Sequence, residues 1–564
     1  MIGVPGESDG RFPKRRHFSR AVYVCIAQYT IPRMATNETC GRAVISLLEA
    51  YGVDTVFGMP GVHTLELYKG LAASKIRHIL VRHEQGAGFM ADGYARATGR
   101  PGVCVLITGP GVTNAATAMG EAYSDSIPML VLSSVNATAD LGMGRGRLHE
   151  ITSQQAVTEP LTAFSKTALS AGEVPDLLAQ AFTVFASARP RPVHISMPLD
   201  VLVEPAEFAI EARTPPPPPS PSAEAVREAS GLLQQARRPV IIAGGGSIAC
   251  GEALERFAVT LGAPVVLTNA AKGVMAADHP LCLGATLSLA PVLALIESAD
   301  VVVAVGSELA ETDSWVDRLP LSGALIRIDI DAMAVQRDYP SSVALVGDAG
   351  HALAALKESV DGTSSSTSGA DLDALRRKCA QAMSPLSRTH MNLLETLRGA
   401  LPDDAIVVTD MTQIAYTGNT HYACSTPRSW FHPNGYGTLG YALPAAIGAR
   451  LGAPERAVVA LVGDGGLLFT VQELATAAEL GLPLIIVLWN NDGLGQIRDD
   501  MIAKGIPEVG VNPRNPDYQL LARAFGCHAV RPDSLDAFAS AVTNALSAHV
   551  PTLIEVRQDA PYLG

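Results

Sequence analysis

The stretch AVVALVGDGG, residues 457–466, is the part of this sequence that decides the fold. Its continuous apolar run, Ala457–Val462, predicts a strand that is buried on both faces, and a glycine-rich turn follows. A helical segment comes next, and a second apolar run, Leu484–Trp489, ends in the tetrapeptide NNDG at 490–493. The order strand, helix, strand predicts a parallel α/β unit with polar residues at the ends of neighbouring strands.

Oxygen-bearing side chains stand at the ends of both predicted strands. Asp464 follows the first strand and Asn491 the second, and a hard divalent cation prefers such oxygen ligands. Gly465 and Gly466 allow backbone N–H groups to approach a diphosphate closely at a helix N-terminus. A lone Gly-Asp-Gly is common in turns. Its combination with Asn-Asn after 24 intervening residues predicts a metal-bridged diphosphate site, and the alternative is two unrelated turns.

A second polar group lies near the start of the chain. Glu84 follows the strand-like run Ile79–Val81 and begins a helical pattern. A glutamate there is also a favourable partner of the helix dipole, so Glu84 alone proves little. The glycine-rich turn Gly109–Asn114, which follows another strand-like run, makes a binding site at this sheet edge the better interpretation.

These motifs resemble those of the acetolactate-synthase-like thiamine diphosphate enzymes, and the resemblance runs from about Met34 to the C-terminus. It implies an α/β fold of three domains with parallel sheets: pyrimidine-binding, central and diphosphate-binding. It also implies a homodimer or homotetramer with shared active sites, in which Glu84 and Asp464 come from different subunits. Further segments that match are Gly58–Gly61, Gly93–Gly99, Gly435–Gly440 and Pro444–Gly448.

Two low-complexity breaks divide the chain, one with five consecutive prolines at Pro215–Pro219 and one rich in Ser and Thr at 362–369. Apolar strand-like runs alternate with helical patterns in every block, as expected for α/β domains; the clearest are Val103–Ile107, Met129–Ser133, Val240–Ala243, Val301–Val305, Ala457–Val462 and Leu484–Trp489. The predicted organisation is an extended N-terminus (1–33), a pyrimidine-binding domain (34–205), a Pro-rich linker (206–221), a central domain (222–358), a Ser/Thr/Gly-rich linker (359–375) and a diphosphate- and Mg²⁺-binding domain (376–564).

Composition narrows the class of protein. The formal charge of −13 over 564 residues argues against a nucleic-acid-binding surface, and no apolar stretch is long enough for a convincing membrane span. The eight cysteines include no C-x-x-C pair, which favours reduced thiols in a cytoplasmic protein over a zinc site. The run Ala21–Ile31 after Lys14–Arg16 weakly resembles a signal peptide, but Gln28 and Tyr29 interrupt it.

The resemblance also implies roles for individual residues. Glu84 would hold N1′ of the pyrimidine ring and favour the imino tautomer, which removes the C2 proton of the cofactor. The carbonyl of Gly437 would accept the 4′-amino group, and Leu439 would wedge the cofactor into its bent shape, unless it is an ordinary core leucine. The implied cofactors are thiamine diphosphate and Mg²⁺, with the diphosphate contacted by Gln413, Gly465 and Gly466 and the metal by Asp464, Asn491 and the carbonyl of Gly493.

Two departures from acetolactate synthases concern the substrate. Asp499 and Asp500 stand where those enzymes carry Gln-Trp. A carboxylate in the pocket would favour a guanidinium, whereas the alternative is a solvated acidic helix face. The family's Phe-Gln-Glu segment reads Leu148-His149-Glu150 here. His149 either donates or relays a proton, or merely replaces the glutamine as a neutral hydrogen-bonding group.

The third departure concerns FAD, which acetolactate synthases hold in the central domain. The triplet Gly244–Gly246 follows a predicted strand, but a lone glycine triplet is weak evidence for a nucleotide. The family's flavin-contacting segments are not recognisable at Leu283–Leu287 or Ser307–Trp315, so bound FAD is doubtful. We expect the acids at 308, 311 and 313 to form an exposed or interface loop.

The expected activity is the decarboxylation of a 2-oxo acid by a thiamine diphosphate-dependent carboxy-lyase. Asp499, Asp500 and the segments Gly61–Glu66 and Leu148–Glu150 favour 5-guanidino-2-oxopentanoate, from arginine catabolism, as the substrate, with 4-guanidinobutanal and CO₂ as products. The alternative is acetolactate synthase activity, in which two pyruvate molecules are joined to 2-acetolactate. A third hypothesis, a non-catalytic flavin- or NAD-binding protein, would rest on Gly244–Gly246 and would not depend on Glu84.

Overall fold

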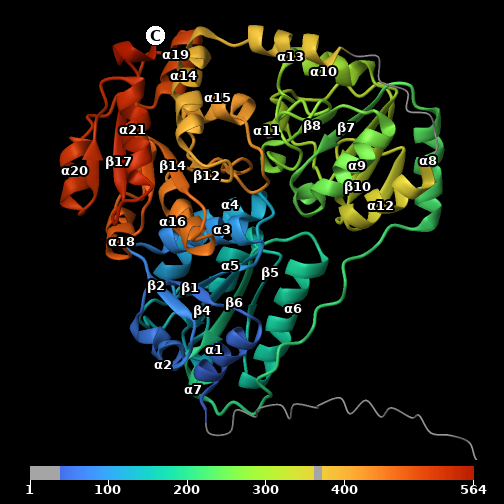
Figure 1. Ribbon diagram of the computed structural model, residues 1–564. Coiled ribbons are helices and arrows are strands. Elements are labelled where there is room, and N and C mark those ends of the chain that lie inside the picture. The colour runs from blue at the N-terminus through green and yellow to red at the C-terminus, as the bar shows by residue number, and fades with distance from the viewer. Residues whose placement is uncertain (1–37, 361–370) are drawn as a thin grey trace, which may run out of the picture.

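The computed structural model describes residues 38–360 and 371–564, which form three parallel sheets covered by helices (Figure 1). The predicted extended N-terminus, 1–33, and the Ser/Thr-rich stretch 362–369 lie outside the described residues. The three-sheet α/β architecture expected from the apolar runs is confirmed. Each of the six runs named above coincides with a strand to within two residues at either end.

The first sheet has six parallel strands in the order β2-β1-β3-β4-β6-β5. The strands are β1 (Thr55–Gly58), β2 (Arg77–Leu80), β3 (Gly102–Leu106), β4 (Met129–Val135), β5 (Phe164–Thr167) and β6 (Val193–Pro198). Strands β3, β4 and β6 are buried along their whole length because helices cover both faces. The helices are α1 (Cys40–Ala50), α2 (Leu65–Ala73), α3 (Glu84–Thr98), α4 (Pro110–Ser124), α5 (Gln154–Thr158), α6 (Val174–Ser187) and α7 (Leu199–Val203).

The central sheet has five parallel strands in the order β11-β10-β9-β7-β8. The strands are β7 (Pro239–Ala243), β8 (Val265–Leu267), β9 (Val301–Val305), β10 (Ala324–Asp329) and β11 (Val343–Val346). Residues 211–222, which include the five prolines, lead into this domain without helix or strand. The helices are α8 (Ala223–Gln235), α9 (Gly251–Leu261), α10 (Ala290–Ser298), α11 (Glu311–Ser314) and α12 (Ala349–Val360).

The third sheet has six parallel strands in the order β13-β12-β14-β15-β17-β16. The strands are β12 (Ile406–Thr409), β13 (Trp430–Phe431), β14 (Val458–Gly463), β15 (Ile485–Asn490), β16 (His528–Val530) and β17 (Thr552–Arg557). The helices are α13 (Leu372–Gln381), α14 (Pro385–Ala400), α15 (Gln413–His421), α16 (Ala442–Gly452), α17 (Asp464–Leu467), α18 (Glu473–Glu479), α19 (Gly495–Ala503), α20 (Tyr518–Ala524) and α21 (Leu535–Ala545). Cys379 of α13 packs into the core of the central domain, next to α10.

The first and third domains share one hydrophobic core, although the whole central domain lies between them in the chain. Helices α3 and α16 lie side by side at the centre of the molecule (Figure 1). A methyl group at Gly93 would overlap the carbonyl oxygen of Ala445, and one at Gly448 would overlap the carbonyl oxygen of Met90. The two glycines therefore permit backbone-to-backbone contact between the helices.

A buried ion pair within α3 lies at the same junction and accepts a hydrogen bond from the third domain. Arg96 Nε donates to Asp92 Oδ1 at 2.6 Å, and the Tyr441 hydroxyl of the third domain donates to the same oxygen at 2.5 Å. Arg96 Nη2 also donates to Asp125 Oδ2 at 2.8 Å. Since Asp92 is fully buried, these donors offset the cost of removing its carboxylate from water.

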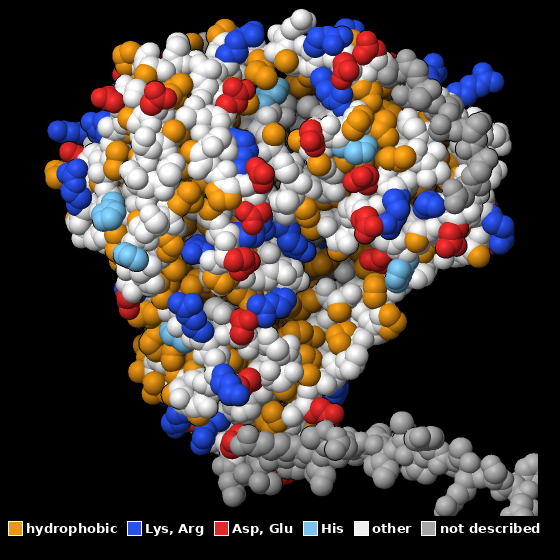
Figure 2. All heavy atoms as spheres, in the orientation of Figure 1, with side chains coloured by type: hydrophobic (Ala, Val, Ile, Leu, Met, Phe, Trp, Pro, Cys, Tyr) orange, Lys and Arg blue, Asp and Glu red, His pale blue; other side chains and the backbone are white. Residues whose placement is uncertain are grey.

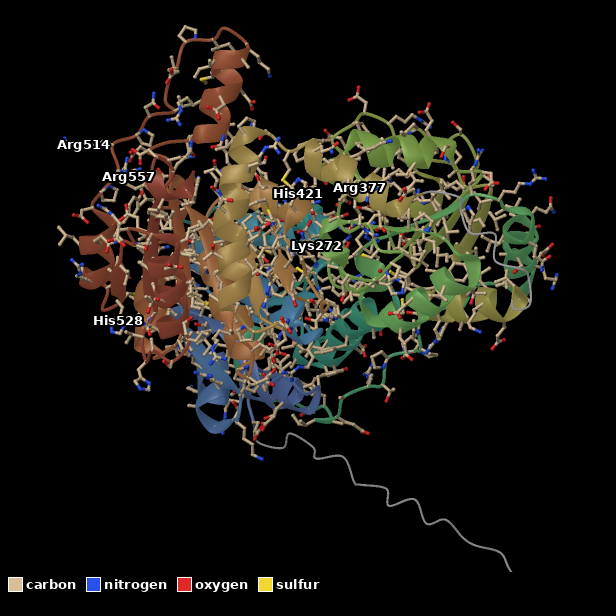
Figure 3. The ribbon with its side chains drawn as sticks, turned by 45° about the horizontal axis from the view of Figure 1, so that its top comes forward. Lys272, Arg377, His421, Arg514, His528 and Arg557 are labelled. Atoms are coloured by element: carbon tan, nitrogen blue, oxygen red, sulfur yellow. The ribbon has the colours of Figure 1, made fainter. Side chains whose placement is uncertain are left out.

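A lysine connects the central domain to the third domain. Lys272 Nζ donates to the carbonyl oxygens of Gly418 at 2.7 Å and Asn419 at 2.9 Å. Burial lowers the pKa of Lys272 to about 8, and burial followed by the charge of Lys272 lowers the pKa of His421. Figure 3 shows both side chains at this junction.

The outer surface carries charges of both signs. Figure 2 shows basic and acidic side chains interspersed over one face of the molecule. Within residues 38–360 and 371–564, no helix combines the length and the apolar character that crossing a membrane requires. The expectation that the protein does not bind nucleic acid stays a prediction.

Replacing Gly93 with alanine tests the helix contact. Alanine normally stabilises a helix relative to glycine, but here we expect a loss of about 1–3 kcal/mol, because the α3 and α16 backbones must move apart. Thermal unfolding followed by circular dichroism measures the change. Gly231→Ala in α8 is the matched control, since a methyl group at Gly231 meets no atom within 4 Å. Equal stability of the two variants would contradict this account of the junction.

Candidate active site

Asp464 is the first residue of α17, directly after β14, and its side chain is buried. Its Oδ2 accepts hydrogen bonds from Gly493 N at 2.9 Å and Asn515 Nδ2 at 2.7 Å. The Tyr518 hydroxyl donates to the Asp464 backbone carbonyl at 2.9 Å. Burial raises the pKa of Asp464, and the hydrogen bonds oppose this shift. Oδ2 is thus engaged by protein donors.

Three oxygen atoms converge on the other side of the carboxylate. When Asn491 Nδ2 donates to Gln413 Oε1 at 3.2 Å, the Asn491 side-chain oxygen lies 3.2 Å from Asp464 Oδ1 and 2.7 Å from the Gly493 carbonyl oxygen. No hydrogen atom lies between these oxygens to relieve their repulsion. Rotating the amide would replace the repulsion by hydrogen bonds, but a cation would relieve it in the present orientation. The donor set therefore fits a hard divalent cation.

The Asp464 carboxylate alone provides too few charged ligands for a metal site built only from protein groups. Among the residues that the structure describes, no group of three or more His, Cys, Asp or Glu side chains could hold a metal ion. A cation beside Asp464, Asn491 and Gly493 would need further oxygen ligands, and a diphosphate can supply them. The arrangement suits a metal held jointly by protein and diphosphate.

Gln413 connects this cluster to α19. It is the first residue of α15, and its Nε2 donates to Asp499 Oδ2 at 2.7 Å. A side chain at Gly495 would overlap the Asn491 amide, so the start of α19 approaches the cluster closely. The structure thus brings Gln413, Asp464, Asn491 and Asp499 together. Asp500 is the next residue of α19 and is exposed, as Asp499 also is, and Gln496 Nε2 donates to its Oδ1 at 3.2 Å.

The turn that contains Gly437 and Leu439 lies on the third domain and is held by two buried acids. Gly440 N donates to Asp410 Oδ2 at 3.0 Å, and Thr438 N donates to Glu121 Oε2 at 3.3 Å. Burial raises the pKa of Asp410 to about 6, and burial followed by the charge of Asp125 raises that of Glu121 to about 10. Leu439 is only half-buried, unlike an ordinary core leucine. No sequence pattern identifies Glu121, because its hydrogen bond with Thr438 joins two different domains.

Glu84 lies in the first domain, at the start of α3. Its side chain is almost fully buried, and Asn114 Nδ2 donates to its Oε2 at 2.9 Å. A methyl group at Gly111 would lie 3.5 Å from Glu84 Oε1, so the glycine-rich turn after β3 flanks the carboxylate. His149 packs against Gly109 of the same turn. The first domain therefore presents Glu84 and His149 together.

The site residues form two separate clusters, one around Glu84 in the first domain and one around Asp464 in the third. The hydrogen bonds of Glu84 stay within the first domain, and those of Asp464 stay within the third. Helix α19, beside the Asp464 cluster, lies at the end of the molecule away from α3 (Figure 1). Across the described ranges, no hydrogen bond or ion pair joins the two clusters directly.

The acidic segment at 308–313 lies at an interface, as expected, although Glu311 and Asp313 belong to the short helix α11 rather than to a loop. Glu308 forms an ion pair with Arg189 of the first domain. The nearby triplet Gly244–Gly246 packs against a second turn, since a methyl group at Gly246 would lie 2.8 Å from the Cα atom of Gly306. The glycines are thus accounted for by the close approach of two backbone turns. The doubt about FAD stays a prediction.

Comparison with known proteins agrees with this geometry. Three family models match the chain: the thiamine pyrophosphate enzyme N-terminal binding domain at 38–157, the central domain at 226–356 and the C-terminal binding domain at 410–556. Together they cover most of the chain, which belongs to the thiamine pyrophosphate (thiamine diphosphate) enzymes. The predicted family and thiamine diphosphate as cofactor are confirmed, and the hypothesis of a non-catalytic flavin- or NAD-binding protein is set aside.

Individual relatives narrow the comparison. The chain is 55% identical over 524 residues to a protein named probable 2-ketoarginine decarboxylase AruI from Pseudomonas aeruginosa, covering 92% of this chain and 94% of that protein. It is 33% identical to the acetolactate synthase large subunit of Corynebacterium glutamicum, covering 90% and 84%. It is 32% identical to the acetolactate synthase isozyme 1 large subunit of Escherichia coli, covering 93% and 94%.

Replacing Glu84 with glutamine tests the first-domain cluster. We expect turnover of 2-oxo acids to fall by about 10²–10⁴-fold, because the amide cannot exchange a proton with the pyrimidine ring as a carboxylate does. CO₂ release measures the effect. Glu224→Gln, in the first turn of α8, is the control and should keep wild-type activity. Full turnover by the Glu84 variant would contradict the assigned role.

Proposed function

We propose that this enzyme decarboxylates 5-guanidino-2-oxopentanoate (2-ketoarginine) to 4-guanidinobutanal and CO₂, using thiamine diphosphate and Mg²⁺. The 55% identity to the Pseudomonas aeruginosa protein, over nearly the whole of both chains, carries the proposal. The acetolactate synthases are more distant, at 32–33% identity. The two carboxylates of α19 supply a physical basis for choosing a cationic substrate.

The two aspartates of α19 differ in their surroundings. Both side chains are exposed, but the Asp499 carboxylate is engaged by Gln413 at 2.7 Å, whereas Asp500 accepts one longer hydrogen bond, from Gln496 at 3.2 Å. We assign Asp500 as the partner of the substrate guanidinium, which binds carboxylates through paired N–H donors. Asp499 then acts through Gln413 and positions it.

An aromatic ring lies near Asp500. Burial raises the pKa of the Tyr416 hydroxyl to about 12, and the charges of Asp410 and Asp500 add to this shift. Tyr416 follows Gln413 by one helical turn on α15, so its ring lies on the same side of the site. A guanidinium between the Asp500 carboxylate and the Tyr416 ring would gain a charge-assisted hydrogen bond and a cation–π contact.

The family's cofactor supplies the chemistry that the side chains lack: a nucleophilic carbon and a sink for the electron pair left by departing CO₂. Glu84 would hold N1′ of the pyrimidine ring, and the Gly437 carbonyl would accept the 4′-amino group. Leu439 would support the bent shape of the cofactor. Gln413, Gly465 and Gly466 would contact the diphosphate. The metal would bind Asp464, Asn491 and the Gly493 carbonyl, whose oxygens converge.

We further propose a homodimer or homotetramer in which each active site combines Glu84 of one subunit with Asp464 of another. The separation of the two clusters within the chain supports this, because the pyrimidine and diphosphate ends of one cofactor need both. The cytoplasmic location stays a prediction; the seven cysteines of the described segments are all free thiols.

The substrate is tested by incubating the purified enzyme, thiamine diphosphate and Mg²⁺ with 2-ketoarginine or with pyruvate. We expect CO₂ and 4-guanidinobutanal from 2-ketoarginine, at a kcat/KM at least ten times that for pyruvate. Acetolactate formed from pyruvate as the preferred reaction would instead identify the enzyme as an acetolactate synthase.

Asp500→Asn tests the guanidinium partner. Removing the charge should lower kcat/KM for 2-ketoarginine by about 10–100-fold, as expected for a charge-assisted hydrogen bond. Turnover of 2-oxopentanoate, which lacks the guanidinium, should change little. Asp536→Asn, an exposed acid at the start of α21, is the control. A parallel loss for both substrates would show that Asp500 does not recognise the guanidinium.

Removal of divalent cations tests the metal site. Activity should disappear after EDTA treatment and gel filtration, and it should return with Mg²⁺ and thiamine diphosphate together. Asp464→Asn should raise the Mg²⁺ concentration needed for half-activation by at least tenfold, because the only carboxylate ligand is lost. Asp492→Asn is the matched control, since the neighbouring Asp492 carboxylate pairs with Arg557 at 2.8 Å. Unchanged Mg²⁺ activation of the Asp464 variant would rule out this ligand set.

A further inference from the structure

Two histidines of the first domain face each other near Glu84. His63 lies in the short 3₁₀ helix η1 (Val62–Thr64), and His149 lies in the loop before α5. Their ring centroids are 5.3 Å apart and the ring planes are nearly perpendicular, at 85°. Both residues are half-buried. His63 belongs to the segment Gly61–Glu66, but its pairing with His149 is not evident from the sequence, because the two residues lie 86 positions apart.

One turn connects this pair to Glu84. Thr108 Oγ1 lies 2.9 Å from His63 Nδ1. The next residue, Gly109, packs against the backbone of His149, and Gly111 flanks Glu84 Oε1. Both histidines and the glutamate therefore lie along the same turn at the carboxyl end of β3, the sheet edge where ligands bind in α/β folds.

The hydrogen bonds of Thr108 determine which nitrogen of His63 carries the proton. The Thr108 hydroxyl donates to Ser134 Oγ at 3.0 Å, so its oxygen is left to accept a hydrogen bond from His63. His63 Nδ1 is then the protonated nitrogen in the neutral ring. Nε2 keeps its lone pair and is the atom that can take up or release a proton.

The pair is arranged to hold one exchangeable proton. Burial lowers the pKa of His63, and the neighbouring His149 lowers it further, because two cationic rings at this separation repel each other. In the described part of the chain, the His149 ring makes no hydrogen bond. His149 also has a positive φ of 61°, an uncommon conformation outside glycine that often occurs at functional sites.

We propose that His63 and His149 form a proton-transfer pair for the decarboxylation, in which His149 protonates the carbon that has lost CO₂ and His63 restores the proton. This rests on the proposed function. The bond between the carboxylate and the carbonyl carbon breaks, CO₂ leaves, and the electron pair stays on the carbon and forms a C–H bond. The balance is RCOCOO⁻ + H⁺ → RCHO + CO₂, so each turnover consumes one proton. His63 Nε2 takes this proton from water and passes it to His149.

Protonation at this step decides the product. If the carbon that has lost CO₂ is protonated at once, the product is released as an aldehyde. If that carbon stays unprotonated, it can attack a second carbonyl compound. The histidine pair thus favours the decarboxylase outcome over carboligation. His149 is a catalytic residue in this scheme, and His63 acts through it as a positioning and proton-supplying residue.

The variants His63→Asn and His149→Asn test the proposal in the full-length enzyme loaded with thiamine diphosphate and Mg²⁺. Asparagine at position 63 retains an N–H donor for Thr108 but lacks a titratable nitrogen. Rapid-quench measurements follow CO₂ and aldehyde separately in the first turnover. We expect the CO₂ burst to stay within about twofold of wild type. Aldehyde release should fall by about 10-fold for His63→Asn and by at least 100-fold for His149→Asn, in the range of general acid catalysis.

The same variants should divert the reaction when acetaldehyde is added as an acceptor, with more carboligation product than the wild type forms. His78→Asn is the control, since His78 also pairs edge-on with an aromatic ring, that of Tyr68, at 5.0 Å but on β2. If both variants lost the CO₂ burst and aldehyde release equally, the histidines would have only a structural role. Wild-type rates of both CO₂ and aldehyde formation in the variants would also overturn the proposal.

The experiment uses whichever 2-oxo acid the wild-type enzyme decarboxylates. Failure of the wild type to act on 2-ketoarginine would refute the proposed substrate, but the split between CO₂ and aldehyde release would still test the histidine pair on the acid that is turned over.

Discussion

The contact between α3 and α16 is the constraint on which the rest of the structure depends. Gly93 and Gly448 allow the two backbones to touch, and the buried Arg96–Asp92 pair with Tyr441 lies beside them. Because of this contact, two domains distant in sequence share one core and behave as a single packed unit. The central domain is attached to this unit by individual hydrogen bonds, such as the one that the Lys272 ammonium donates to the Gly418 carbonyl oxygen.

Helix α4 relates the two binding clusters within this unit. Near its N-terminus, Asn114 holds the Glu84 carboxylate, and near its C-terminus, Glu121 holds Thr438 of the turn that contains Leu439. The helix extends over about 22 Å, at 1.5 Å per residue. If each active site is shared between subunits, as proposed, then one helix contacts two different sites.

The proposed chemistry combines residues that hold the cofactor with a few residues that select the substrate and the product. The convergence of Asp464, Asn491 and Gly493 fits a metal-bound diphosphate whatever the substrate. In the proposed mechanism, Asp500 on α19 recognises the cationic end of the substrate, and the His63–His149 pair supplies the proton. The site thus separates the general task of holding the cofactor from the particular tasks of selecting a substrate and a product.

The sequence by itself determined the parallel α/β architecture, the family and the residues Glu84, Asp464 and Asn491 as candidates, because apolar runs and metal-ligand chemistry are properties of neighbouring residues. It left open which aspartate binds the substrate and whether Leu439 is a core residue, and it predicted neither the pairing of His63 with His149 nor the contact of Glu121. Only the tertiary structure decided that Gln413 engages Asp499, 86 residues away, and that His63 faces His149. Such contacts join residues far apart in the chain, so no local pattern records them.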